Sequence, residues 1–316
     1  MVGINMNIQV LKENKVIQNL INQNADSDNP ITDEVLQNNF ISLLEFIMDY
    51  TECEKGPLKK CNQRIRGRQL NLTYKNSNFY LSSSHCLHFE YENRNQNIKN
   101  NYIYKDFSVD EYPKTIKDYI NGLKTEGFFT DEEIKERDLL INNAGKQILR
   151  YIEVKNNIDR ENIKGVYIYG NPGIGKTTIM KTLANEAAKR EQKVFFCTAA
   201  ELIEKYKEQF SNNGFGNVKY MDQMKKCDIL FIDDFAGEMT SLWTRDNLWF
   251  GILNYRMNRK KLTFISSNFT KEELNKVYLI EKQPKDLEVK KIARLKERIS
   301  TLTSFYALSG TETKRQ

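Results

Sequence analysis

The sequence predicts an α/β fold in which a mostly parallel sheet is flanked by helices, preceded by a smaller domain of helices and β structure. A glycine-rich loop at 170–177 lies between a short β-branched and aromatic run and a helical stretch. Apolar runs recur at 194–197, 229–232 and 262–266, with helical segments between them. Strands that alternate with helices are typical of a parallel sheet. The glycine-rich loop within it predicts a P-loop nucleoside triphosphatase core.

Length and composition limit the alternatives. A chain of 316 residues is long enough for about two domains. It has no run of about 18 apolar residues, so we expect no membrane span, and its start, MVGINMNIQV, lacks the basic segment of a secretory signal. Five cysteines are an odd number in a long chain, which argues against a disulfide framework. We therefore expect a reduced, cytoplasmic protein.

Charge is distributed unevenly along the chain, whose formal net charge is +6. Residues 1–50 carry 2 basic and 7 acidic side chains, residues 51–100 carry 9 and 4, and residues 251–316 carry 15 and 7. An acidic first segment followed by basic ones favours contacts with protein partners or anions at particular regions, although solvated faces have such patterns too.

The first fifty residues predict two helices, over 5–22 and 33–49, joined by a turn-rich loop. Thr32 and Asp33 are candidates to cap the second helix. That helix is more apolar than one buried face requires, so we expect it to pack on other structure, either a partner protein or its neighbouring helix. We define residues 1–50 as a helical domain.

A small β unit is predicted next, because the periodicity changes to two between 64 and 92. Apolar residues alternate over 70–74 and again at Leu87, Phe89 and Tyr91, with a possible turn at 76–78. We expect this β domain at 51–105 and, from the asparagine-rich and charged sequence that follows, a linker at 106–130. Thr130 and Glu133 form a capping box that opens a helix to about Tyr151, which begins the larger domain at 131–316.

The glycine-rich loop predicts a phosphate site, since it fits the pattern GxxxxGK[ST] between a strand and a helix. Backbone N–H groups of such a loop and the positive end of the following helix face phosphate oxygens. Lys176 is positioned to reach the β and γ phosphates of ATP, and the Thr177 hydroxyl to bind Mg²⁺. The expected nucleotide-binding residues are Gly170, Asn171, Pro172, Gly173, Ile174, Gly175, Lys176, Thr177 and Thr178.

Polar side chains follow two of the other predicted strands. The run ILFIDD ends in Asp233 and Asp234, and a later strand ends in SSN, with Asn268 last. At the carboxyl end of a parallel sheet Asp233 would hold Mg²⁺ through its water shell, and Asp234 would orient the attacking water or simply cap a turn. Asn268 is a weaker candidate for a hydrogen bond to the γ-phosphate or to that water.

Cysteines and histidines are concentrated before the larger domain. Cys53, Cys61, Cys86, His85 and His88 all fall within 53–88, and thiolate with imidazole is the ligand set of tetrahedral zinc. If Cys86 and His88 lie on a strand, they share a face that His85 does not, so Cys53, Cys61, Cys86 and His88 are the preferred ligands of one structural Zn²⁺. His85 is the substitute, and ordinary buried thiols are the alternative. We expect Cys197 and Cys227 to be core residues.

The ordered set of motifs resembles a known family. The segments GNPGIGKTT, LFIDDFAGE, WTRDNLWFGILNYRM, TFISSNF and ARLKERI are similar to those of the AAA+ ATPase module in bacterial replicative helicase loaders of the DnaI/DnaC type. The resemblance covers about residues 130–310, and WTRDN and the cysteines favour the DnaI branch. That branch has a zinc-binding N-terminal domain, which adds to the zinc prediction.

The resemblance also implies roles for individual residues. Lys176 and Thr177 match the Walker A pair, Asp233 and Asp234 the Walker B pair, and Asn268 the sensor 1 residue. Arg294 and Arg298 lie one helical turn apart, and we favour Arg298 as the arginine finger that reaches a neighbouring subunit's γ-phosphate. Vigorous AAA+ ATPases have Glu where this chain has Asp234, so we expect slow hydrolysis, with ATP used as a switch.

Partners follow from the resemblance as well. It implies that residues 1–50 dock the replicative hexameric helicase, and that the ATPase module binds single-stranded DNA and self-associates. Phe210, Phe215, Lys219 and Tyr220 form an aromatic and basic tract suited to stacking bases. Arg245 fits an inter-subunit contact and a core position equally well.

Other functions remain open from the sequence alone. A related ATPase that assists a transposase or phage replication would differ in partner and not in chemistry. A P-loop kinase of a small molecule would need an arginine-bearing lid soon after the core. A zinc adaptor with a vestigial P-loop would not need Lys176, Thr177 and Asp233.

Overall fold

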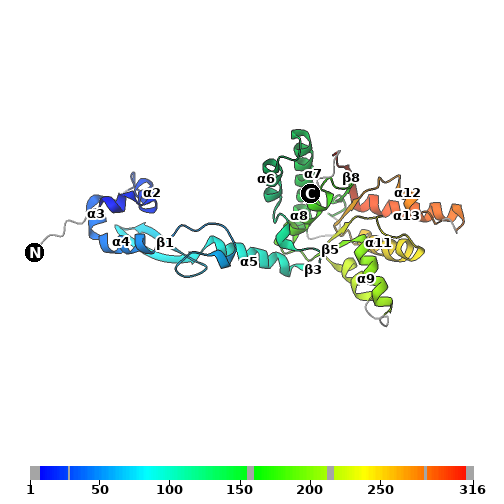
Figure 1. Ribbon diagram of the computed structural model, residues 1–316, viewed down its shortest axis with the longest axis horizontal. Helices are drawn as coiled ribbons and strands as arrows, with labels where there is room; N and C mark the ends of the chain where they lie inside the picture. Colours follow the sequence, from blue (N-terminus) through cyan, green and yellow to red (C-terminus); the bar gives the residue numbers. More distant parts are fainter. Residues whose placement is uncertain (1–7, 28, 155–159, 212–216, 281–282, 311–316) are drawn as a thin grey trace, which may run out of the picture. The chain divides into compact units, whose positions relative to one another are not determined.

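The computed structural model describes residues 8–27, 29–154, 160–211, 217–280 and 283–310, with the side chains of Glu126, 208–211 and 217–219 left out. The chain divides into two compact units, with the boundary between Arg94 and Asn95. Figure 1 labels many of the elements of both units, and each unit is described by itself below.

The N-terminal unit begins with four short helices in place of the two that the sequence predicts. They are α1 (Gln9–Glu13), α2 (Lys15–Gln23), α3 (Asp33–Asn38) and α4 (Phe40–Asp49). The first break is at Asn14, whose side chain accepts hydrogen bonds from the amides of Val16 (3.0 Å) and Ile17 (3.3 Å). An asparagine that caps a new helix in this way competes with continuation of the old one.

A β-hairpin packs against these helices. A 3₁₀ turn, η1 (Leu58–Lys60), precedes the antiparallel strands β1 (Arg68–Lys75) and β2 (Asn78–His85). Asn76 and Ser77 connect them with φ angles of 50° and 59°, as a tight hairpin turn requires. One face of the hairpin joins the helices in a small core of fully or nearly buried side chains: Leu11, Ile17, Ile31, Leu36, Leu43, Phe46 and Leu72.

The expected strand around Leu87, Phe89 and Tyr91 is wrong, because this segment begins the helix α5 (Leu87–Asn100). Three alternating apolar residues are compatible with either a strand or a helix. Only the length of the element distinguishes the two. The buried positions of α5 are His88, Asn95 and Ile98, which follow a helical spacing.

The second unit is built on a six-stranded parallel sheet in the order β3-β5-β6-β7-β4-β8. The strands are β3 (Tyr102–Tyr104), β4 (Gly165–Tyr169), β5 (Val194–Thr198), β6 (Ile229–Asp233), β7 (Thr263–Ser267) and β8 (Thr303–Ala307). The four inner strands confirm the sequence prediction. The two edge strands, β3 and β8, are additional to it.

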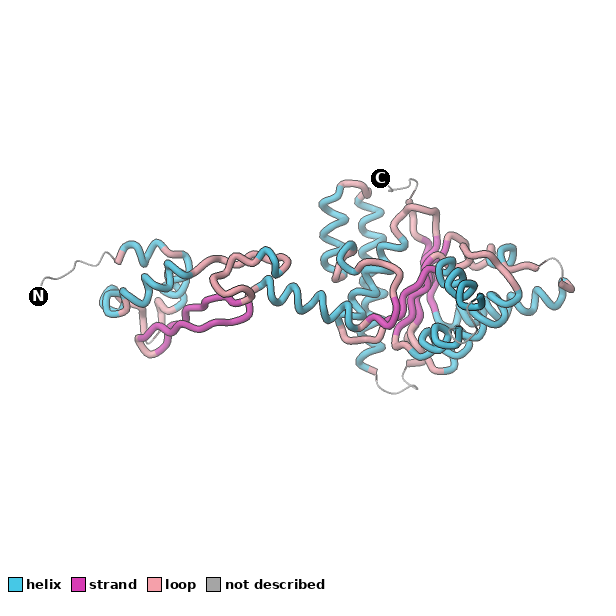
Figure 2. Tube along the Cα trace, turned by 60° about the horizontal axis from the view of Figure 1, so that its bottom comes forward, coloured by secondary structure: helices cyan, strands magenta, loops and turns pink. Residues whose placement is uncertain are grey.

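Helices cover both faces of this sheet, and Figure 2 shows the strands as a layer between them. One face packs on α6 (Ile116–Glu126), α7 (Asp131–Glu153) and α8 (Lys176–Lys189). The other packs on α9 (Ala199–Ser211), α10 (Asn217–Lys226), the π-helix η3 (Trp243–Trp249), α11 (Phe250–Asn258), α12 (Leu274–Val277) and α13 (Lys285–Leu302). Both faces are buried, which explains why the strands read as continuous apolar runs.

The expected linker at 106–130 is instead a folded part of this unit. It contains the 3₁₀ turn η2 (Val109–Glu111) and α6, and Tyr119 and Leu123 of α6 are buried in the core. The sequence looked like a linker because an amphipathic helix exposes its charged face. The second unit therefore begins near Asn95, before the expected start at 131.

Within the described part of the chain, no helix is both long and apolar enough to cross a membrane.

Candidate functional site

The glycine-rich loop connects β4 to α8, as the sequence predicts. Gly173 and Gly175 have φ angles of 83° and 96°, which glycine adopts without steric cost. They let the chain turn sharply, so that α8 begins at Lys176 with its N-terminus at the carboxyl edge of the sheet. The backbone amides of a helix N-terminus and the helix dipole favour an anion at this point.

A cavity of about 720 Å³ lies beside this loop. Predicted residues that line it are Pro172, Gly173, Gly175, Lys176, Thr177, Thr178, Asp233, Asp234 and Asn268. Gly170, Asn171 and Ile174 are not among the lining residues. The structure thus brings both acidic strand ends and the later asparagine to the phosphate loop.

Lys176 is buried, and its side chain donates hydrogen bonds to the loop and to Asn268. Its Nζ lies 2.8 Å from the carbonyl oxygen of Gly170, 2.7 Å from that of Asn171 and 2.7 Å from Oδ1 of Asn268. A phosphate in the cavity would exchange with some of these acceptors, so the lysine is already held at the site where an anion is expected.

Asp233 ends β6 as a buried carboxylate. The Ser266 hydroxyl donates a hydrogen bond to its Oδ1. Burial raises the pKa of Asp233, although the hydroxyls of Ser266 and Thr177 act in the opposite direction. A divalent cation would offset the cost of keeping this carboxylate charged, and Thr177 lies close enough to share it.

Asp234 is exposed at the cavity, in contrast to Asp233. Its backbone has a φ of 50°, and Ser266 Oγ accepts a hydrogen bond from its amide at 3.1 Å. Asn268 Nδ2 donates to its Oδ1 at 2.9 Å. Asp234, Asn268 and Lys176 therefore form one hydrogen-bonded series along the floor of the cavity.

The rest of the cavity wall comes from residues that sequence reasoning missed. Tyr112, Pro113, Tyr119, Leu123, Phe128 and Phe129 line it, all from the stretch interpreted as a linker. Lys181 of α8 donates to the Tyr112 hydroxyl at 2.9 Å. We call these six residues the aromatic wall, and an apolar wall beside a phosphate cradle suits a nucleobase. The many aromatic residues between 102 and 129 are the sequence feature from which this wall could have been predicted.

The two arginines of ARLKER lie away from this cavity. Arg294 and Arg298 are on α13 and stack over Phe250 of α11, with centroid distances of 4.5 and 5.6 Å. Arg298 Nε also donates to Asn254 Oδ1 at 2.9 Å. Neither lines the P-loop cavity of its own chain.

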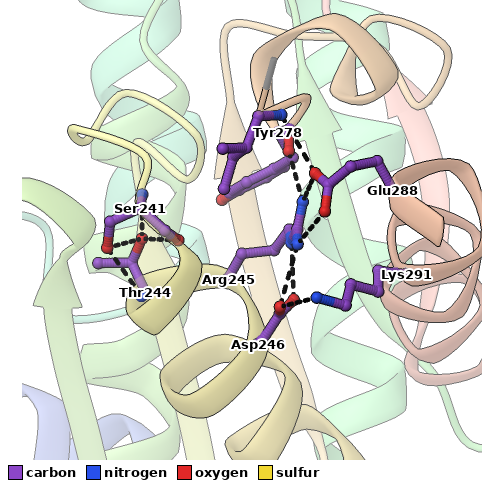
Figure 3. A network of polar contacts seen from close by, with 8 residues as sticks. Ser241, Thr244, Arg245, Asp246, Tyr278, Glu288 and Lys291 are labelled. Atoms are coloured by element: carbon purple, nitrogen blue, oxygen red, sulfur yellow. Dashed lines mark hydrogen bonds and ion pairs between the residues drawn. The ribbon is translucent and has the colours of Figure 1, made fainter. Parts of the chain in front are cut away.

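Arg245 is a core residue, which decides between its two predicted roles. It is fully buried in η3 and pairs with Glu288 at the start of α13 and with the adjacent Asp246 (Figure 3). It also donates to the carbonyl oxygen of Tyr278 at 2.9 Å, and Lys291 lies 3.0 Å from Asp246. These bonds fasten α13 to the segment that follows β6.

In the N-terminal unit, Cys53, Cys86 and His88 place one ligand atom each within 4.8 Å of one another. Cys53 Sγ lies 3.1 Å from His88 Nδ1, and Cys61 Sγ lies 3.7 Å from Cys86 Sγ. Two thiolates on one tetrahedral zinc are about 3.8 Å apart, given Zn–S bonds of about 2.3 Å. The donor set of Cys53, Cys86 and His88 therefore fits a structural zinc ion. Cys61, the fourth predicted ligand, lies outside this three-residue group, although its Sγ adjoins that of Cys86.

Backbone amides support this cluster although its strand assignment is wrong. Cys86 directly precedes α5, so the helix N-terminus faces it. Gly67 N–H donates to Cys61 Sγ at 3.3 Å. Burial raises the pKa of the Cys61 thiol, but the amides of Gly67 and Gln63, the Cys86 thiol and the charge of Arg66 together lower it below its ordinary value. His85 instead stacks on Phe89, with ring centroids 4.0 Å apart.

The remaining candidates take different places. Cys197 and Cys227 are buried in the core of the second unit, as expected. Tyr220 is partly buried and packs edge-on against Tyr104. Phe215 and the side chains of Phe210 and Lys219 lie outside the described residues.

Comparison with known proteins agrees with this geometry. A family model of the bacterial DnaA ATPase domain matches residues 142–282. The strand order, with the P-loop strand β4 beside β7 and the acidic strand β6 next to that, is that of an AAA+ P-loop nucleoside triphosphatase. The second unit has this fold.

The more particular similarity is to a helicase loader. The chain is 32% identical over 147 residues to the replicative helicase loader DnaI of Bacillus subtilis, a match that covers 46% of each protein. The predicted resemblance to loaders of the DnaI/DnaC type is confirmed over this stretch. The match spans about half the length of DnaI.

Two further similarities are more distant. The chain is 25% identical over 105 residues to the chromosomal replication initiator protein DnaA of Campylobacter jejuni, which covers 33% of this chain and 23% of that protein. A crystal structure of DnaI has a TM-score of 0.43 and 29% identity, and covers 55% of this chain and 84% of that one.

Proposed function

We propose that this protein is an ATP-dependent loader that binds the replicative hexameric DNA helicase in the cytoplasm and delivers it onto single-stranded DNA when replication begins. The observation that carries the proposal is the assembly of Lys176, Thr177 and Asp233 at one cavity, in a chain similar to a replicative helicase loader. A vestigial P-loop that binds no ATP would not be expected to retain all three groups at one cavity.

At this site ATP and Mg²⁺ bind with the phosphates on the loop. Lys176 contacts the β and γ phosphates, Thr177 and Asp233 hold Mg²⁺, and the aromatic wall takes the base. Asn268 forms a hydrogen bond with the γ-phosphate as the sensor 1 residue, and Asp234 orients the attacking water. Because Asp234 is one methylene shorter than Glu, hydrolysis is slow and bound ATP acts as a switch.

The ATPase unit self-associates and uses Arg298 as its arginine finger, with Arg294 in the same site. Their position on α13, outside the cavity of their own chain, supports a role toward a neighbouring subunit. A guanidinium held by Asn254 and Phe250 is preorganised for such a contact.

The N-terminal unit docks the helicase, with its fold stabilised by one zinc ion on Cys53, Cys61, Cys86 and His88. Its α4 exposes Ile41 and Met48, 65% and 78% accessible and seven residues apart on one helix face. Apolar side chains on an acidic helical region suit a partner surface.

Size-exclusion chromatography with light scattering tests this proposal. The protein is mixed with the replicative helicase from the same cell, with and without ATP and Mg²⁺. We expect a complex that is lost when residues 1–94 are deleted and weakened in Ile41→Glu/Met48→Glu. Leu139→Glu, at a 63% exposed leucine of the ATPase unit, is the matched control and should leave the complex intact.

Absence of a complex under every condition would refute the loader assignment. The AAA+ unit would then call for a different partner, such as a transposase.

A further inference from the structure

Arg137 of α7 is a buried cation, and its hydrogen bonds to the described residues all go to backbone carbonyl oxygens. Its side chain is inaccessible and donates to the carbonyl oxygens of Glu133 (3.1 Å), Ile174 (2.9 Å) and Ser309 (3.1 Å). The Glu136 carboxylate is 4.0 Å from Nη1, and Nε has no hydrogen-bond partner among the described residues. Burying a guanidinium in this way is costly, so its position calls for a function.

The contact with Ile174 determines how the phosphate loop presents its amides. A trans peptide holds its C=O and N–H on opposite sides of one plane. Because Arg137 binds the carbonyl of Ile174, the N–H of Gly175 in the same peptide is turned away from Arg137. Gly175 lines the cavity, so this amide is available to a phosphate there.

The same guanidinium supports the aromatic wall. Its Cζ lies 4.4 Å from the ring centroid of Phe129, which lines the cavity from the segment between α6 and α7. A cation over an aromatic ring is attracted to it and restricts the position of the ring. Arg137 therefore contacts both the phosphate end and the base end of the site.

The backbone that follows β8 completes this arrangement. Ser309 accepts from Arg137 and donates its amide to Glu136 at 3.1 Å. The neighbouring Leu308 lies so close to the loop that a Cβ on Gly170 would be 2.5 Å from its carbonyl oxygen. Arg137 thus joins the loop, the wall and this backing segment.

We propose that Arg137 is a positioning residue for nucleotide binding, which fixes the Ile174–Gly175 peptide with its N–H toward the phosphates and holds Phe129 against the base. This inference rests on the proposed ATP binding. Arg137 does not touch the nucleotide, so its loss weakens affinity through the groups that it orients.

The test uses the full chain and a fluorescent ADP with Mg²⁺, titrated against wild type, Arg137→Gln and Arg137→Lys. The matched control is Arg160→Gln. Arg160 stacks on Tyr151 at 4.1 Å and donates to two carbonyl oxygens, yet does not line the cavity. Its replacement therefore removes backbone hydrogen bonds and a ring contact of the same kinds without a link to the loop.

We expect Arg137→Gln to raise Kd at least about tenfold, the effect of losing one hydrogen bond of about 1.4 kcal/mol. Arg137→Lys should raise it less, because lysine keeps the charge but not the three-way geometry. Arg160→Gln should leave Kd within about twofold, and kcat at saturating ATP should change little in any of them.

A wild-type Kd in folded Arg137→Gln would overturn the inference. If that variant does not fold, Arg137→Lys decides: a raised Kd supports the role and an unchanged one overturns it. If wild type itself binds no ADP, it is the proposed function that fails.

Discussion

At the scale of single residues, the nucleotide site depends on which groups are held before ATP arrives. Lys176 is bound to Asn268, which is in turn bound to Asp234. A γ-phosphate that draws Lys176 away would free Asn268, so the residue expected to sense this phosphate is already connected to the one expected to orient water. We therefore propose that the amide side chain of Asn268 couples ATP binding to hydrolysis.

The length of the side chain at 234 should control the rate of hydrolysis. Asp234→Glu brings the carboxylate one methylene nearer to the water, and we expect kcat to rise about three- to tenfold with little change in the Kd for ATP. Steady-state phosphate release measures kcat, and Asp234→Asn should lower it. A glutamate variant as slow as the asparagine variant would contradict this role.

The cysteine and histidine cluster makes a prediction about metal content. We expect purified protein to carry one zinc ion per chain, and Cys86→Ser to lose it and to destabilise the N-terminal unit. Cys197→Ser is the control, since Cys197 is a buried thiol of the ATPase core. Elemental analysis measures zinc directly, and wild-type protein without zinc would leave ordinary thiol packing as the explanation.

At the scale of elements, α13 depends on one buried ion pair. Arg245 and Glu288 are 1% and 0% accessible, and their bonds join η3 to the helix that carries Arg294 and Arg298 (Figure 3). The hydrogen bond from Arg245 lowers the pKa of Glu288 below its ordinary value of 4.5. This pair therefore links stability to the position of the proposed finger.

Removing one partner of this pair should cost more than removing both. Arg245→Met leaves a buried carboxylate unpaired and should lower the free energy of unfolding by about 3–5 kcal/mol, and Arg245→Met/Glu288→Met by much less. Urea unfolding at pH 7 measures both. Equal losses in the two variants would mean that packing, and not charge, dominates at this position.

The same pair sets a pH dependence. Because the folded-state pKa of Glu288 is below 4.5, its contribution is fully present above pH 4.5 and is lost as the pH falls through the folded value. Wild-type stability should therefore decline more steeply below pH 4.5 than that of the double variant. Parallel declines would assign the acid sensitivity to other carboxylates.

The sequence predicted elements well where local pattern and packing agree. The loop at 170–177, the capping box at Thr130 and the inner strands are continuous, strongly patterned segments, and each is where it was expected. The prediction failed where tertiary contacts determine the secondary structure. β3 has three residues and exists because it pairs with β5, and the segment at Leu87 is helical although its apolar residues alternate.

Prediction of the site follows the same rule. Strand ends on a parallel sheet converge, so Asp233, Asp234 and Asn268 could be assigned to the P-loop from sequence. The aromatic wall could not, because no motif relates Tyr112 or Phe129 to a loop that lies sixty or forty residues later. The role of Arg137 could not be predicted from sequence for a similar reason, since only the fold brings its side chain to the loop.

At the scale of the whole molecule, the unit boundary near Asn95 predicts which shortened chains should fold and bind ATP. A chain starting at Asn95 keeps β3, α6 and the aromatic wall, whereas one starting at Asp131 lacks them. We expect the first to fold and bind ATP and the second to bind at least about tenfold more weakly or to aggregate. Circular dichroism with nucleotide titration compares them, and equal affinity would exclude a role for the aromatic wall.

In the function that we propose, the N-terminal unit would recognise the helicase and the second unit would respond to ATP. Since a hexameric ring cannot thread onto a strand that has no ends, delivery to closed DNA requires a protein that opens or assembles the ring. This requirement distinguishes loading from mere binding.

The most direct measurement is therefore helicase activity on a circular single strand that carries an annealed oligonucleotide. We expect the oligonucleotide to be displaced efficiently only when helicase, wild-type protein and ATP are all present, and Lys176→Ala to abolish the stimulation. Displacement at the same rate with and without this protein would contradict the assignment as a helicase loader.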